Sequence, residues 1–244
     1  APGLIQHLPQ RLAAIEALGI ETTLVLPFDE AMSQIPAEMF IQGLYVDLGR
    51  IHSICVGAHF AFGHQRQGNV ELLQRLGQEM NFIVHGLASV SLDDETVSST
   101  RIRQAIETGQ LDAAGQMLGR EYALTGEVVQ GDQRGRELGY PTANLEVDGL
   151  CLPPNGVYAA HAQVGEITHR AAVNIGLRPT IADAEPSLHV EAHLLDFEGD
   201  LYGQPLALTF VGKLRDETKF DSLDTLKNQI EKDLVSARYL FTQL

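Results

Sequence analysis

Two side chains with oxygen donors, Thr142 and Asn144, lie two positions apart in a segment rich in glycine and arginine. In an extended chain both would point to the same side and present a hydroxyl and an amide carbonyl, hard oxygen ligands that suit Mg²⁺. Arginines suit phosphate oxygens, and glycines let a ligand approach the backbone. The segment's other candidate residues are Gly131, Arg134, Gly135, Arg136, Gly139 and Pro141. We interpret it as a phosphate and metal site, with a plain glycine-rich hairpin as the alternative because the sequence has no Walker A pattern.

A carboxylate between two imidazoles forms a second group, made of His189, Glu191 and His193. In a strand these three side chains would share one face, and the apolar residues between them would face the core. On the accessible face, Glu191 could take a proton from a substrate hydroxyl. A zinc site is a weaker alternative because a third ligand is missing, and a solvated strand face is the other alternative.

A third group stands where a helix is predicted to begin, and it combines hydroxyls with positive charge. Serine is a good N-cap, and hydroxyls, free backbone N–H groups and arginines at a helix start also form an anion site. We interpret the group as a phosphate site, with capping as the alternative explanation for the serines. Its residues are Ser98, Ser99, Thr100, Arg101 and Arg103.

A glycine-flanked loop at residues 57–68 carries two aromatic rings and an arginine, Phe60, Phe62 and Arg66. Aromatic faces can stack on a planar ligand. We interpret this loop as a candidate ligand loop with a weaker signal than the three groups above.

Two fold patterns would position these groups. In the first half, helical spacing at residues 11–18, 37–48 and 70–80 alternates with strand-like runs at 22–28, 51–56 and 82–87. Strands separated by helices imply a parallel sheet, so we expect an α/β domain. Two further helices are predicted at 99–107 and 111–118.

The second half has short alternating strands with Gly and Pro between them, which is typical of an antiparallel barrel. Apolar residues at helical spacing from 223 to 241 predict a closing helix. We place the domain boundary near residue 120, giving domains 1–120 and 121–244. The predicted strands are 122–129, 156–164, 168–175, 188–197 and 206–214.

The charge balance excludes a general nucleic-acid-binding surface. The chain has 17 Lys+Arg against 32 Asp+Glu, a net charge of −15 that is spread evenly over both halves. The sequence has no apolar run long enough for a membrane span and no signal-peptide pattern. Its two cysteines, Cys55 and Cys151, suit a reducing compartment. We therefore expect a cytoplasmic protein without nucleic-acid or membrane partners.

The second half contains six motifs in one register: GYPTAN (139–144), LPPNGVY (152–158), NIGLRPT (174–180), EAHLLDF (191–197), LYG (201–203) and LRDETKF (214–220). Together they resemble the prokaryotic bifunctional riboflavin kinase/FAD synthetase family. The resemblance implies a six-stranded flavokinase barrel with a C-terminal helix, which transfers the γ-phosphate of ATP to the 5′-hydroxyl of riboflavin and releases FMN. It also implies that Thr142 and Asn144 hold Mg²⁺ and the nucleotide phosphates, and that Glu191 is the general base. Arg178, Arg215 and Glu217 lie in stretches that form loops around the flavin and nucleotide in the family.

The first half resembles the family's Rossmann-type nucleotidyltransferase domain, which adenylylates FMN to FAD. Residues 98–103 match its ATP-phosphate motif, and residues 56–68 match its flavin-side loop. The family's opening strand and its H-x-G-H loop are absent, and the flavin-side loop has a histidine where an acidic residue usually precedes the phenylalanine. The chain also lacks a first Met and starts on a helix, so we expect a truncated domain. The sequence thus predicts a riboflavin kinase without FMN adenylylation; the alternative is a non-catalytic flavin- or nucleotide-binding regulator.

Overall fold

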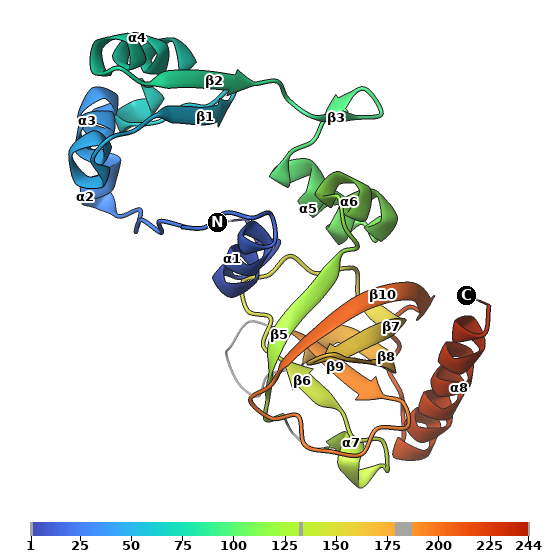
Figure 1. Cartoon of the computed structure of the whole chain (residues 1–244). Helices are drawn as coiled ribbons and strands as arrows, with labels where there is room; N and C mark the ends of the chain where they lie inside the picture. The colour runs from blue at the N-terminus through green and yellow to red at the C-terminus, as the bar shows by residue number, and fades with distance from the viewer. Residues whose placement is uncertain (1, 132–133, 179–186, 244) are drawn as a thin grey trace. The chain divides into compact units, whose positions relative to one another are not determined.

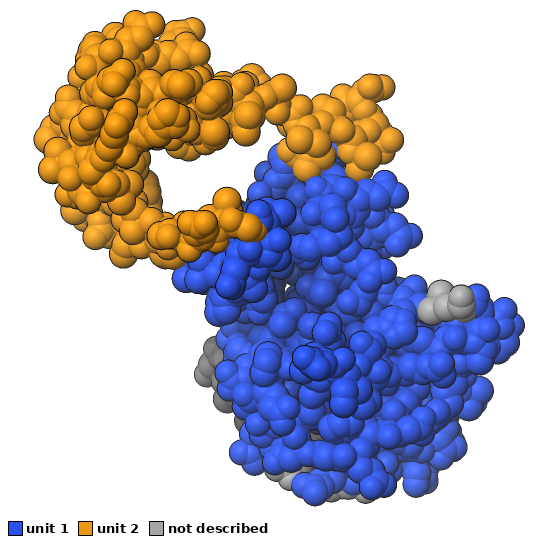
Figure 2. Space-filling model, in the orientation of Figure 1, with its two compact units in different colours: residues 1–18, 98–244 blue, residues 19–97 orange. Residues whose placement is uncertain are grey.

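The computed structural model describes residues 2–131, 134–178 and 187–243 and divides into two compact units (Figures 1 and 2). Unit 1 comprises residues 1–18 and 98–244, and unit 2 comprises residues 19–97. The contacts group the helices just before residue 120 with the barrel, and the domain boundary near residue 120 stays a prediction.

A closed barrel of six strands forms the centre of unit 1. All of its pairs are antiparallel, in the order β10-β5-β6-β9-β8-β7 with β7 pairing back to β10. This confirms the predicted flavokinase-type barrel. Alternation alone indicates five of the strands and misses β6, which has three residues. The strands are β5 (Ala123–Val129), β6 (Ala143–Leu145), β7 (Gly156–Val164), β8 (Ile167–Arg178), β9 (Ser187–Leu194) and β10 (Pro205–Arg215).

The barrel interior is an apolar core. Leu124, Ile175, Val190, Leu206 and Leu208 are each at most 1% exposed. Burial of each such side chain contributes about 1.5–3 kcal/mol relative to its exposure to water. Because alternate residues fill the interior, the residues between them on β6, β8 and β9 point outward.

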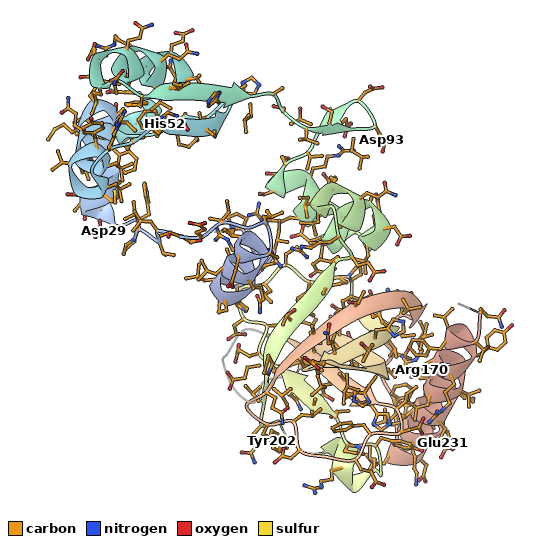
Figure 3. All side chains as sticks on the ribbon, viewed as in Figure 1. Asp29, His52, Asp93, Arg170, Tyr202 and Glu231 are labelled. Carbon is orange, nitrogen blue, oxygen red and sulfur yellow. The ribbon has the colours of Figure 1, made fainter. Side chains whose placement is uncertain are left out.

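Helix α8 (Leu223–Phe241) lies along the outside of the barrel, against β7, β8 and β10 (Figure 1). Its Ala237 and Phe241 are buried against alanines of β7 and β8. The guanidinium of Arg170, a residue labelled in Figure 3, lies 5.5 Å from the centre of the Phe241 ring. Arg238 pairs with Asp196 and lowers the pKa of that carboxyl, chiefly through its hydrogen bonds. The helix is thus fixed as an outer wall beside the barrel. No helix within the described ranges is long and apolar enough to span a membrane.

The described part of unit 1 contains four further helices, most of them close to their predicted positions. The first begins at Leu8, three residues before its predicted start, because Gln10 and His7 form a capping box around Pro9. Ser98 caps the next one, where its Oγ accepts a hydrogen bond from the Arg101 N–H. These helices are α1 (Leu8–Glu16), α5 (Ser99–Glu107), α6 (Leu111–Leu118) and α7 (Arg134–Glu137).

Unit 2 is a small α/β unit. Strands β1 (Ser53–Gly57) and β2 (Ile83–Leu87) pair in parallel, and α4 (Val70–Met80) connects them, as the alternation predicts. Its core is a cluster that includes Ile41, Phe62, Leu73, Leu76 and Phe82. The other elements are α2 (Glu30–Ser33), α3 (Ala37–Leu48), the short helix η1 (His64–Arg66), β3 (Ser91–Leu92) and β4 (Glu95–Thr96).

The predicted strand at residues 22–28 is wrong, since the structure gives this run no regular element. Leu24 is 56% exposed, Val25 50% and Phe28 83%. β-branched and apolar residues favour a strand only where a neighbouring strand accepts their backbone hydrogen bonds. No strand in the described part of unit 2 pairs with this run, so its parallel sheet has two strands.

Candidate active site

A cavity of about 370 Å³ lies outside the barrel, lined by residues of β6, β8 and β9, of the segment after β10, and of α8. Its walls include the candidate residues Thr142, Asn144 and Glu191. Thr142 and Glu191 are 49 positions apart in the chain, so the fold brings together groups that the sequence keeps separate.

Neighbouring strands place three polar side chains in one row across the barrel wall. Asn144 on β6 is the register partner of Glu191 on β9, and Glu191 is the register partner of Asn174 on β8. Directly opposite residues on one face of a sheet have Cβ atoms roughly 4.5–5.5 Å apart. The Glu191 carboxylate is therefore flanked by two amide side chains. Asn174 was not among the residues singled out from the sequence, because only the strand register shows its position.

Thr142 lies beside this row. Its Oγ1 donates to Glu191 Oε2 at 3.5 Å, the long end of a hydrogen bond. The residue between Thr142 and Asn144, Ala143, is only 7% exposed and packs in the barrel core, so the two polar side chains point outward together. This confirms the extended conformation expected from their spacing.

The predicted faces of β9 are also confirmed. Val190, Ala192 and Leu194 are buried in the barrel core, whereas His189 and His193 line the cavity with Glu191. Within the described residues, no three His, Cys, Asp or Glu side chains are grouped so that they could hold a metal ion by themselves.

Local geometry explains the three glycines of the 131–139 segment, two through neighbouring atoms and one through its backbone angle. A Cβ at Gly131 would lie 2.3 Å from Asn144 Nδ2, and a Cβ at Gly135 would lie 2.4 Å from the Tyr140 carbonyl oxygen. Gly139 has a φ of +90°, which favours glycine whatever the space around it. The sequence predicts that these glycines leave room for a ligand. In the structure, Gly131 makes room for Asn144, and Gly135 makes room for the backbone at Tyr140.

Arg215 is held by the helix. Its Nε and Nη2 donate to the Asp233 carboxylate at 2.9 and 2.7 Å, and its Nη1 donates to the Asp216 carbonyl at 2.9 Å. Asp233 is only 7% exposed and also accepts from Gln229 at 2.9 Å. The sequence does carry a signal for Asp233, because it is an acidic residue on the apolar stripe of α8.

Glu217 lies over the backbone of β8. Asn155 Nδ2 donates to Glu217 Oε2 at 3.0 Å, and a Cβ at Gly176 would lie 2.4 Å from Glu217 Oε1. Glu217 and Arg215 both line the cavity, in agreement with their predicted place near a ligand.

Two other predicted residues of this region do not line the cavity. Arg136 and Pro141 are exposed and are not among the cavity residues. The side chains of Arg134 and Arg178 lie outside what the structure describes.

A further cluster, whose contacts the sequence does not predict, links the Pro141–Thr142 segment to β9 and α8. His193 Nδ1 lies 2.8 Å from the Pro141 carbonyl oxygen, and the Tyr140 ring meets the His193 ring edge-on with centres 6.0 Å apart. The Tyr140 hydroxyl donates to Glu231 Oε1 at 3.0 Å. Loss of water contacts, together with this hydrogen bond, raises the pKa of Tyr140.

The candidate residues of the first half fall into two separate sets. In unit 1, Ser99 and Thr100 are exposed at the start of α5, while Arg103 Nε donates to the Gly3 carbonyl at 2.6 Å. Arg103 thus has a structural partner within the chain.

The candidate loop of unit 2 has a structural role too. The rings of Phe60 and Phe62 stack with centres 5.4 Å apart. Phe62 is 8% exposed and belongs to the core of unit 2, whereas Phe60 is 41% exposed and Arg66 is also exposed. Of the two rings, Phe60 is therefore the one that a ligand could reach.

Comparisons with known proteins agree with this architecture. The riboflavin kinase (Flavokinase) family model matches residues 118–241, and the FAD synthetase family model matches residues 1–101. A bifunctional riboflavin kinase/FMN adenylyltransferase from Haemophilus influenzae is 37% identical over 243 residues, which cover 99% of this chain and 78% of the relative. The protein of the same name from Escherichia coli is 37% identical and is covered to 77% of its length by 99% of this chain.

A solved structure has the same fold. The crystal structure described as a macrolide-efflux protein from Streptococcus pneumoniae aligns over 96% of this chain and 75% of its own, with a TM-score of 0.78 and 31% identity. The two family models and the relatives together show that the chain belongs to the bifunctional riboflavin kinase/FMN adenylyltransferase family and contains matches to both of its domains.

Proposed function

We propose that the barrel of unit 1 is an ATP-dependent riboflavin kinase, with its active centre in the cavity beside β9. The observation that carries this proposal is the convergence of the Thr142 hydroxyl, the Asn144 amide and the Glu191 carboxylate on one wall. The reaction moves the γ-phosphoryl group of ATP to the 5′-hydroxyl of riboflavin. It releases ADP and FMN.

Glu191 is the general base in this proposal. Its carboxylate accepts the proton of the flavin hydroxyl as the oxygen–phosphorus bond forms and the bond to ADP breaks. The two flanking amides and Thr142 limit where the carboxylate can turn, because it lies between their register positions. A base that is already oriented toward the cavity loses less entropy when substrate arrives.

The same residues fit a divalent cation such as Mg²⁺. Thr142 and Asn144 would hold it with hard oxygen atoms, and Mg²⁺ commonly binds through one or two protein groups plus substrate phosphates and water. That pattern agrees with the lack of a larger acidic or histidine cluster among the described residues. When bound, the cation supplies charge neutralisation at the ATP phosphates.

Removal of divalent cations should therefore stop FMN formation. We expect the chain incubated with riboflavin, ATP and EDTA to give only background FMN by liquid chromatography, and excess MgCl₂ to restore one ADP for each FMN. Flavin binding without ATP consumption under the restored conditions would contradict the proposal and would favour a non-catalytic regulator.

Substitution of Gly131 by alanine should disturb the Asn144 side chain. The new Cβ would overlap the Asn144 amide, and a misplacement of about 1 Å in a reacting group can cost roughly 10²-fold in rate. We expect FMN formation to fall by about tenfold to 10²-fold while the barrel stays folded. Gly43→Ala is the matched control, since nothing lies within 4 Å of the position where its Cβ would be. Equal rates of FMN formation in the two variants would rule out the proposed role of Asn144 in the reaction.

For the first half, we propose that the chain as given does not convert FMN to FAD. The supporting observation is the absence of an H-x-G-H motif from its sequence. Incubation with FMN, ATP and MgCl₂ should give neither FAD nor pyrophosphate. FAD accompanied by an equal amount of pyrophosphate would show that this half is active.

We further propose that the chain acts in the cytoplasm on the small molecules riboflavin and ATP. Cys55 and Cys151 are both free thiols, which suits a reducing compartment. Burial and the neighbouring Glu107 raise the pKa of Cys151 to about 12, so this thiol stays protonated and unreactive at neutral pH.

A further inference from the structure

We propose that His193 is a positioning residue that fixes the extended Pro141–Thr142 segment, and with it the Thr142 hydroxyl, from the side of β9. This inference rests on the proposed function, because Thr142 is one of the residues proposed to bind the nucleotide and metal. The geometry behind it is the contact of 2.8 Å between His193 Nδ1 and the Pro141 carbonyl oxygen.

The backbone ladder between β6 and β9 ends before this segment. Its register pairs stop at Ala143 and Ala192, so Thr142 and Pro141 lie just beyond the last backbone pair. A proline has no N–H and cannot donate to a neighbouring strand. His193 is the next residue of β9, and its side chain supplies the hydrogen bond that the ladder lacks.

The contact also fixes the proton on the imidazole. A carbonyl oxygen can only accept, so Nδ1 must carry hydrogen, in either the neutral or the charged ring. In the neutral ring the acceptor is then Nε2. The Pro141 carbonyl thus selects the tautomer with hydrogen on Nδ1. In general, the hydrogen bond that one ring nitrogen of a histidine makes determines which of the two nitrogens carries the proton.

The other side of the ring is supported as well. Tyr140 meets the His193 ring edge-on, and the Tyr140 hydroxyl is held by Glu231 of α8, which Figure 3 labels. The segment before Thr142 is therefore fixed by a side chain of β9 and by a side chain of α8. A shift of His193 would move the segment that carries the Thr142 hydroxyl.

Two substitutions by amide side chains, His193→Asn and His193→Gln, distinguish the effect of the hydrogen bond to the Pro141 carbonyl from the effect of the size of the ring. The amide of asparagine lies near the position of Nδ1, so His193→Asn can still donate to the Pro141 carbonyl. The longer glutamine places its amide nearer the position of Nε2, and His193→Leu has no donor at all. We expect His193→Gln and His193→Leu to raise the KM for ATP by about tenfold or more, with a smaller change in the KM for riboflavin. His193→Asn should recover most of that loss.

The measurement is FMN formation as a function of ATP at saturating riboflavin, and of riboflavin at saturating ATP, with thermal unfolding of each variant to check the fold. His52→Gln, an exposed histidine of unit 2, is the control that should match the unsubstituted chain. The proposal is overturned if His193→Asn is as impaired as His193→Leu, or if His193→Gln keeps the normal KM for ATP.

A second readout does not need turnover. Nitrogen NMR of the full chain labelled with ¹⁵N-histidine should show Nδ1 of His193 protonated, and His193→Leu assigns the signal. If this tautomer is present but the unsubstituted chain makes no FMN, the kinase function fails while the contact stands. An unprotonated Nδ1 would overturn the positioning contact itself.

Discussion

Glu191→Gln should lower kcat for FMN formation by about 10²–10⁴-fold, the range that a positioned general base contributes. Glutamine has nearly the same shape as glutamate, so it should keep the neighbours that the strand register gives it, Asn144 and Asn174. Its amide cannot take the proton of the flavin hydroxyl. The loss should therefore fall on kcat, with little change in the binding of ATP.

The rate of FMN formation at saturating substrates measures this effect directly. Glu166→Gln is the matched control, because Glu166 is an exposed carboxylate in the turn between β7 and β8. It should be as active as the unsubstituted chain. Undiminished kcat in Glu191→Gln would remove Glu191 from its role as base and leave positioning as the sole contribution of this wall.

Asp233→Asn should cost about 3 kcal/mol of unfolding free energy in unit 1. Removal of one partner of a buried ion pair costs roughly 3–5 kcal/mol, because the other charge is left without compensation. We expect a cost at the lower end of this range, because the Arg215 side chain is 23% exposed and its charge is therefore partly hydrated. Since Arg215 and α8 both line the cavity, FMN formation should fall as well.

Urea unfolding followed by far-UV circular dichroism gives the free energy, with Asp148→Asn as an exposed control in the same unit that should change it by less than about 0.5 kcal/mol. The double variant Arg215→Met/Asp233→Leu should recover part of the lost stability without recovering activity, because buried ion pairs can be replaced by apolar side chains. An unchanged free energy in Asp233→Asn would show that the pair does not hold the helix.

The two faces of β9 could be predicted from sequence because apolar and polar residues alternate strictly along it. Its period of two residues separates Val190, Ala192 and Leu194 from Glu191 and the two histidines, and this is why the faces could be assigned before the strand was seen. The same logic placed Thr142 and Asn144 on one side. A strand of three residues such as β6 carries too little pattern to be recognised, so its pairing with β9 could not be predicted from the residues alone.

The register between strands is the information that the residues themselves do not carry. Asn174 flanks Glu191 because β8 and β9 pair in one register, and a slip of one residue would turn Asn174 to the core. The prediction of a strand at residues 22–28 was wrong for a related reason. A local preference for the strand conformation does not supply a neighbouring strand to pair with. Asp233 could have been found, because an acidic residue within the apolar stripe of a helix needs a buried cation.

Transfer of a labelled γ-phosphate tests the central claim most directly. The full chain would be incubated with riboflavin, MgCl₂ and ATP labelled at its γ-phosphate, and the flavins would be separated by chromatography. The account predicts that the label appears in FMN, at one label per flavin and with an equal amount of ADP, and that Glu191→Gln transfers at most about one-hundredth as fast. Label that stays in ATP or appears only as inorganic phosphate, with riboflavin unchanged, would contradict it.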